Sequence, residues 1–172
     1  MRKIHTPLTK DVIQSLTVGE ELLLDGIIYT ARDRAHQQLV RAIGQNKRLP
    51  LSLKEQIIYY CGPTAALKQR AIGSCGPTTS ARMDEFTVDL LKQGLKGMIG
   101  KGSRSTQVRE AIKKYGAVYF LTIGGAGALL STKVKRAAVA AYKSFGPEAI
   151  YRLEVENFPL IVGIDCRGRD LL

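Results

Sequence analysis

The sequence predicts a mixed α/β protein with strand-rich ends and helices in the middle. Apolar, β-branched runs alternate with segments whose apolar residues recur at helical spacing. The 172 residues suit a single domain over residues 1–172 with a sizeable core. With 45% hydrophobic and 24% charged residues, the composition is ordinary for a soluble globular protein.

The first part of the chain alternates strand and helix. The run EELLLDGIIYT is rich in apolar and β-branched residues, which predicts a strand pair, 18–25 and 27–30, around Gly26. A helix is predicted over 33–45, because its apolar residues recur on one face. The proline- and lysine-containing stretch QNKRLP then indicates a surface loop. The apolar run QIIYYC predicts a buried strand over 56–61.

The middle of the chain contains most of the predicted helices. An apolar stripe predicts a helix over 79–93, and a short strand follows at 97–100. A second stripe predicts a helix over 106–115. The run VYFLTI predicts a strand over 118–123, and small residues then favour a helix at about 126–133.

The last part of the chain is predicted to consist of strands. Apolar and β-branched runs place them near 137–142, 149–155 and 160–165. Together with the strands at the front, they explain why sheet is expected at both ends of the sequence.

The charge favours anionic partners. The net charge is +11, with 26 Lys and Arg against 15 Asp and Glu. The chain has no Trp, only four Phe and no basic tail, so the usual signs of nucleic-acid binding are weak. No apolar run approaches the length of a membrane span, and MRKIHTPLTKDV lacks the apolar core of a signal peptide. We therefore expect a cytoplasmic protein that does not enter membranes.

The cysteines do not have the spacing of a metal site. Cys61, Cys75 and Cys166 form no CxxC pair, and the two histidines, His5 and His36, are not clustered. Each cysteine is interpreted as a small buried thiol. We therefore expect no metal site within this chain alone.

Three predicted helix starts share one pattern of hydroxyls and cations. In the first, Thr30 and Asp33 are spaced like a capping box, with Arg32 in the first turn. In the second, GSCGPTTSARMD, a Gly-Pro turn precedes two threonines, with Arg82 one turn into the helix. In the third, GKGSRST, Lys101 lies between two glycines and hydroxyls precede a helix.

Such turns are suited to binding anions. A helix start presents free N–H groups and a partial positive charge, and glycine lets a ligand approach the backbone. Arginine can grip a carboxylate through two parallel hydrogen bonds. A phosphate loop is excluded, because Lys101 is followed by Gly102 rather than Ser or Thr. The run from Gly124 to Gly127 is no dinucleotide fingerprint, because Leu130 stands where the last glycine would be.

The motifs GPTTSARMD, YTARDRAH and GKGSRS, with the tail PEAIYRLEVENFPLIVGIDCRGRDLL, resemble the β subunit of class I, iron–sulfur-dependent fumarate hydratases and L-tartrate dehydratases. The resemblance covers essentially the whole chain. It implies a swivelling β/β/α domain with three layers, in which mixed sheets pack with helices. It also implies that the cluster ligands are three cysteines of a partner α subunit, which would hold a [4Fe–4S] cluster.

The resemblance implies roles for four residues. Arg32, Arg82 and Lys101 should bind the carboxylates of a dicarboxylate substrate, and Thr78 should handle the proton at carbon 3 as the catalytic residue. Arg82 should also tune Thr78. The chain departs from the commoner TTSGRMD at Ala81, which a helix accommodates easily.

The resemblance implies a hydro-lyase that is active only with the α subunit, in a hetero-oligomer for which α2β2 is one stoichiometry. Reversible hydration of fumarate to (S)-malate, a reaction of the tricarboxylic acid cycle, is the first expectation. Dehydration of L-tartrate to oxaloacetate is the alternative, and the four residues do not discriminate between them. Two other classes stay open: a basic nucleic-acid-binding domain, and a stand-alone sugar or phosphate enzyme that uses the same anion-binding turns.

Overall fold

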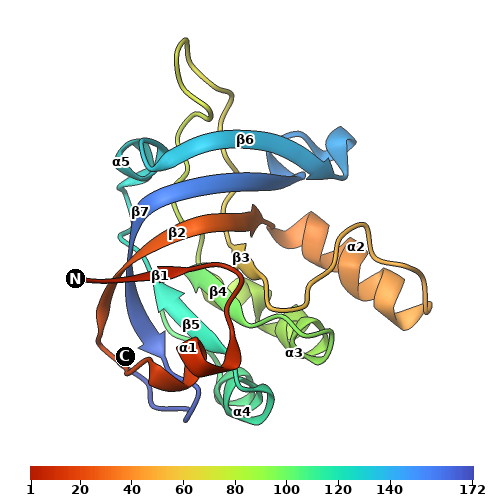
Figure 1. Cartoon of the computed structure of the whole chain (residues 1–172). Coiled ribbons are helices and arrows are strands. Elements are labelled where there is room, and N and C mark those ends of the chain that lie inside the picture. Colours follow the sequence, from red (N-terminus) through yellow and green to blue (C-terminus); the bar gives the residue numbers. More distant parts are fainter.

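The computed structural model describes all residues, 1–172 (Figure 1). The strands are β1 Arg2–His5, β2 Glu21–Thr30, β3 Ile57–Tyr59, β4 Gly97–Gly100, β5 Val118–Leu121, β6 Val134–Ala141 and β7 Ile150–Ile164. The α-helices are α1 Lys10–Ser15, α2 Asp33–Gly44, α3 Asp84–Lys92, α4 Thr106–Tyr115 and α5 Gly127–Ser131. Two 3₁₀-helices complete the set, η1 Ser80–Met83 and η2 Lys143–Glu148.

All seven strands join in one sheet that curls until it closes. The order is β1-β2-β3-β4-β5-β7-β6, and β2 also pairs with β7. Strands β1 to β5 pair with one another in parallel. Strand β7 runs antiparallel to its three neighbours, β2, β5 and β6. The β2–β7 pairing makes a closed ring of five strands, which removes the free edges that an open sheet would have there.

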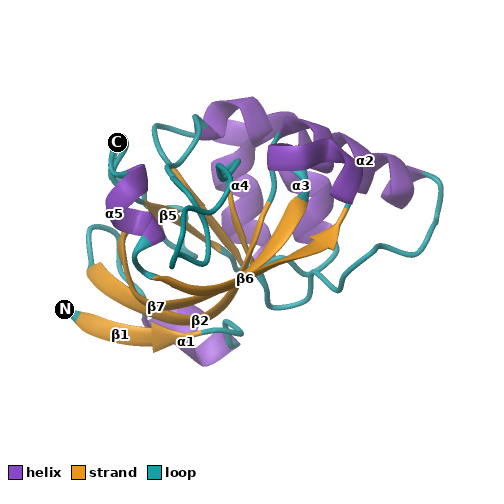
Figure 2. Ribbon diagram, turned by 90° about the horizontal axis from the view of Figure 1, so that it is seen from above, coloured by secondary structure: helices purple, strands orange, loops and turns teal.

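Two hydrophobic cores hold this arrangement together. Alternate residues of each strand face opposite sides of the sheet, so neighbours such as Tyr59 and Tyr60 enter different cores. The first core fills the ring with residues such as Phe120 and Phe158. The second lies between the ring and helices α2, α3 and α4, which Figure 2 shows together on one side of the strands. The predicted mixed α/β class is confirmed.

The structure corrects two predictions of separate strands. The predicted strand pair around Gly26 is one strand, β2, with an irregularity in its pairing to β7 between Leu24 and Gly26. Gly26 has φ +115°, and a Cβ there would collide with Thr6 Oγ1, so this position needs glycine. The predicted strands 149–155 and 160–165 are likewise one strand, β7, which continues through Pro159. Gly26 and Pro159 therefore both lie within strands.

Most other elements agree with the sequence prediction. Helices α2 and α4 and strands β3, β4 and β5 lie where they were expected, with small differences at their ends. Strand β1 and helix α1, of four and six residues, were not predicted. The expected helix over 79–93 begins as η1 and continues as α3.

None of the helices combines the length and the apolarity that crossing a membrane would require.

Candidate functional site

The predicted site residues come together at the carboxyl ends of neighbouring parallel strands. Arg32 follows the end of β2, and Lys101 directly follows β4. The segment after β3 crosses between them, because Thr78 N donates to the Tyr60 carbonyl oxygen at 2.7 Å. Thr79 pairs with Lys101 in a parallel bridge. The carboxyl edge of parallel strands is where open α/β sheets bind ligands.

Arg82 lies between the threonine and the start of α2. Its Nη1 donates to Thr78 Oγ1 at 3.3 Å. Its Nε donates to Asp33 Oδ1 at 3.2 Å, and its Nη2 donates to Asp33 Oδ2. The guanidinium therefore uses three of its donors at once, two on a carboxylate and one on the hydroxyl that the sequence singled out.

The Arg32 side chain packs against the backbone at Gly62, where a Cβ would be 2.7 Å from Arg32 Cδ. Its Nε is buried and has no hydrogen-bond acceptor in this chain. The Arg32 carbonyl oxygen accepts a hydrogen bond from His36 Nδ1 at 2.8 Å, so His36 carries a proton on Nδ1. Burial lowers the pKa of His36 to about 4, which keeps this ring uncharged at neutral pH.

Lys101 lies at the open side of the site. The loop after β5 passes next to it, and a Cβ on Gly124 would be 3.3 Å from Lys101 Cδ. Arg82 is 46% exposed and Lys101 is also exposed. Arg32 and Thr78 are part-buried, so only two of the four site residues are freely open to solvent in this chain.

Buried polar groups fix the backbone beneath the site. The Tyr119 hydroxyl donates to the Gly102 carbonyl oxygen at 2.8 Å and lies 2.8 Å from Ser80 Oγ. Burial raises the pKa of Tyr119 to about 12, so this hydroxyl keeps its proton. Ser80 N donates to the Lys101 carbonyl oxygen at 3.0 Å. These bonds join η1 to the Lys101 turn and therefore fix the backbone positions of Lys101 and Arg82 relative to each other.

Two of the three helix starts have no side-chain cap. Thr30 does not cap α2: its hydroxyl accepts from Tyr151 N at 3.1 Å, on the neighbouring strand β7. Arg32 is the residue before the helix, in extended backbone, rather than in the first turn. Thr79 precedes η1 without a side-chain cap. Ser105, in contrast, caps α4, since its Oγ accepts from Val108 N at 3.3 Å. The hydroxyls before α2 and η1 are thus not used for capping.

The cysteines of this chain do not form a cluster site. Cys61 and Cys75 are fully buried, with their sulfur atoms 3.5 Å apart. The contact with Cys75 and burial raise the pKa of the Cys61 thiol above its usual range. Cys166 lines a separate hollow with Lys113 and Lys114. No group of three His, Cys, Asp or Glu side chains is placed to hold a metal ion.

Sequence reasoning assigned no site role to Asp33, although it contacts Arg82 through both carboxylate oxygens. The sequence suggested for Asp33 only a place in a capping box with Thr30, which is a common arrangement at helix starts. The contact joins residues 49 positions apart, and no local pattern reports it.

The chain is similar to known proteins of one family along nearly its whole length. The family model described as Fumarase C-terminus matches residues 2–172. A Methanocaldococcus jannaschii protein, provisionally named L(+)-tartrate dehydratase subunit beta, is 39% identical over 177 residues, covering 99% of this chain and 91% of its own length. Fumarate hydratase 1, mitochondrial, of Leishmania major is 41% identical, covering 99% of this chain and 32% of its own length.

A third relative is the anaerobic class I fumarate hydratase of Escherichia coli, which is 40% identical over 94% of this chain. The chain spans only 30% of that enzyme. It thus matches nearly all of a protein named as a subunit and about a third of the longer fumarate hydratases. With its whole length matched by the family model and by these relatives, the chain belongs to the Fumarase C-terminus family.

Proposed function

We propose that this chain is the β subunit of a hydro-lyase that adds water to fumarate to give (S)-malate and removes it in the reverse direction. The convergence of Arg32, Thr78, Arg82 and Lys101 at one edge of the sheet is the observation that carries the proposal. The names of the relatives support it, since they are fumarate hydratases and a tartrate dehydratase subunit.

The three cations supply what this reaction needs from the protein. The proton removed from malate lies next to a carboxylate and is weakly acidic, so negative charge develops on the substrate. Cations fixed in advance stabilise that charge without reorganising. Arg32 fits this role because its Nε is buried without an acceptor in the chain, a costly arrangement that is typical of functional positions.

Thr78 is the proposed proton-transfer residue. A threonine hydroxyl has too high a pKa to act as a base by itself, so neighbouring cations must favour its deprotonated form. Arg82 Nη1 donates to Thr78 Oγ1, which is the contact that would stabilise a negative charge on that oxygen. The neutral, buried His36 cannot take this role, because it is enclosed beneath the site.

A partner completes the site in this proposal. Arg82 and Lys101 are exposed in this chain, so a second polypeptide is needed to exclude water from the substrate. The resemblance assigns a [4Fe–4S] cluster to that α subunit, and this chain has no ligand set of its own. When bound there, the cluster supplies a Lewis acid for the substrate hydroxyl. We infer that the chain swivels as one domain against this partner, in a hetero-oligomer.

Dehydration of L-tartrate to oxaloacetate is the second candidate. It is favoured by one observation: the tartrate dehydratase subunit is the relative whose length this chain nearly matches, at 91%. Tartrate carries one more hydroxyl than malate, and the same cations serve both dicarboxylates.

The test is co-expression with an α-type partner, anaerobic purification, and assay of malate and tartrate side by side. Replacing Thr78 with alanine should lower turnover by about 10²–10⁴-fold, the usual contribution of a proton-transfer group. Binding of the dicarboxylate should stay measurable, because the three cations remain. Exchange of the carbon-3 hydrogen of malate with deuterium from solvent reports the proton-transfer step directly.

Thr79→Ala is the matched control. Thr79 is the adjacent residue, is exposed, and makes no side-chain hydrogen bond in the structure. This variant should keep near-normal turnover. Near-normal turnover in Thr78→Ala would show that Thr78 is not the base.

A further inference from the structure

We propose that Asp33 is a positioning residue, which orients the Arg82 guanidinium so that Nη1 points at Thr78 Oγ1. This proposal rests on the proposed function, because it gives Arg82 and Thr78 the roles described above. Asp33 is the first residue of α2, and Arg82 lies in η1, 49 positions later in the chain.

The geometry of the contact carries the inference. An arginine has two faces that can each bind a carboxylate with parallel N–H donors: the Nε–Nη2 side and the Nη1–Nη2 side. Asp33 occupies the Nε–Nη2 side with both of its oxygens. This fixes the plane of the guanidinium and leaves Nη1 facing Thr78 Oγ1 at 3.3 Å.

Exposure explains why such an anchor is needed. The side chains of Arg82 and Asp33 are 46% and 30% exposed. A long arginine side chain at that exposure has many accessible rotamers, and packing alone does not select one. Asp33 has no other side-chain hydrogen bond in the structure, so both of its oxygens serve this one contact.

The charge balance is compatible with the role of Thr78. The Asp33 carboxylate offsets part of the positive charge of Arg82. This partial neutralisation, taken alone, would disfavour a negative charge on the Thr78 oxygen. Arg32 and Lys101 leave the site with a net positive charge, since three cations face one carboxylate. The gain is therefore orientation: the hydrogen bond from Nη1 is held in place before the proton moves.

The experiment combines kinetics on the complex with NMR of the full chain. In Asp33→Asn, kcat should fall by about 10-fold or more while KM changes by less than about threefold, because an interaction made in the transition state is lost. With 15N-labelled arginine, the Nε–H signal of Arg82, identified by its absence in Arg82→Ala, should shift and exchange faster with water in Asp33→Asn.

A double-mutant cycle separates positioning from any other role of Asp33. If Asp33 acts through Arg82, then adding Asp33→Asn to Arg82→Ala should change kcat by less than about twofold. An equal fall of kcat in both backgrounds would overturn the proposal. So would an unchanged kcat, or an unchanged Arg82 signal, in the single variant Asp33→Asn. If that variant does not fold, Asp33→Ala replaces it, because alanine has the highest helix propensity and offers no oxygen to Arg82.

The matched control is Asp89→Asn. Asp89 forms a surface ion pair with Lys92 at 3.4 Å in α3 and has no contact with the site. It should keep the kinetics and the Arg82 signal of the unmodified chain. If the unmodified complex hydrates no dicarboxylate, the proposed function fails. The Arg82 signal then decides by itself: its change in Asp33→Asn supports the positioning contact, and its persistence overturns it.

Discussion

Arg104 is a charged residue whose side chain is buried in the interior. Its side chain is 0% exposed, and its Nε donates to Asp84 Oδ1 at 2.6 Å. Its Nη2 donates to Thr87 Oγ1 at 2.8 Å, and the guanidinium lies 4.9 Å from the centre of the Tyr119 ring. Asp84 in turn accepts from Ser105 N at 2.7 Å. Arg104 thus joins α3, the loop after β4 and the start of α4.

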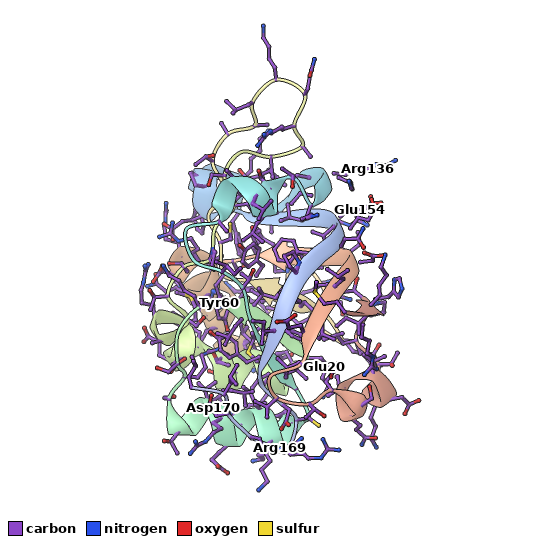
Figure 3. The ribbon with its side chains drawn as sticks, turned by 90° about the vertical axis from the view of Figure 1, so that its left-hand side faces the viewer. Glu20, Tyr60, Arg136, Glu154, Arg169 and Asp170 are labelled. Atoms are coloured by element: carbon purple, nitrogen blue, oxygen red, sulfur yellow. The ribbon has the colours of Figure 1, made fainter.

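Replacing Arg104 with alanine should destabilise the fold by about 3–5 kcal/mol, because it leaves the carboxylate of Asp84 without its buried partner. Urea unfolding measures this loss. Arg136→Ala is the control: Arg136 is 84% exposed, and Figure 3 shows it near Glu154 at the outer surface. Its loss should change the free energy of unfolding by less than about 0.5 kcal/mol. Equal losses in both variants would contradict the assignment of Arg104 as a structural residue.

The four candidate residues are easier to recognise in the sequence than Asp33 and Arg104. Arg32, Thr78, Arg82 and Lys101 could be proposed from the sequence as candidates, because they stand beside turn residues and match a family pattern. The contacts of Asp33 and Arg104 could not. The sequence shows an acid at a helix start and an arginine in a loop, and both are common on surfaces.

The junction between β4 and η1 determines how the site is assembled at the level of the elements. Gly100 ends β4 against η1, and a Cβ at this position would collide with Ser80 Oγ and lie 2.9 Å from Tyr60 Cδ2. The close approach allows Ser80 N to donate to the Lys101 carbonyl oxygen. Only a residue without a side chain lets the two turns come this close.

Gly100→Ala should therefore lower the free energy of unfolding by about 1–3 kcal/mol, as overpacking does, and should also reduce turnover by displacing Lys101 from η1. Thermal unfolding and the malate assay measure the two effects. Gly44→Ala is the control, because nothing lies within 4 Å of a Cβ added at Gly44. We expect it to change stability by less than about 1 kcal/mol. A Gly100→Ala variant as stable and active as the Gly44→Ala variant would show that the junction is loose.

At the level of the whole molecule, the burial of His36 beneath the helical layer makes the stability of the fold depend on pH in the acid range. It is buried between Tyr60 and Phe86, with ring centroids 5.4 Å and 5.7 Å away. Burial lowers its pKa to about 4 from an ordinary value of 6.5, the hydrogen bond to Arg32 only partly opposing this. Between these values the unfolded chain binds a proton that the folded chain does not. The contribution of the buried, neutral His36 to the free energy of unfolding is therefore complete above pH 6.5 and is lost as the pH falls toward 4.

The expected loss over that interval is about 3 kcal/mol, since each pKa unit corresponds to 1.36 kcal/mol. His36→Gln should show a flatter decline of stability between pH 6.5 and pH 4, because glutamine does not titrate. Urea unfolding at several pH values measures both profiles. Parallel profiles for the two proteins would mean that other groups cause the acid sensitivity.

The amino-acid sequence by itself determined the alternation of strands and helices and the residue types at the turns, because periodicity and turn chemistry are local. It did not determine that β2 continues through Gly26 and that β7 continues through Pro159. The closed ring decided that, since β7 pairs with β2 along most of its length.

Tertiary structure alone decided which turns share one edge of the sheet and which residues meet there. Asp33 and Arg82 are 49 positions apart, and Thr79 and Lys101 are brought together by parallel pairing. Such contacts depend on strand order and on how the helices pack over the ring. A pattern of neighbouring residues does not contain that information, because the free energy that selects it comes from burying two cores at once.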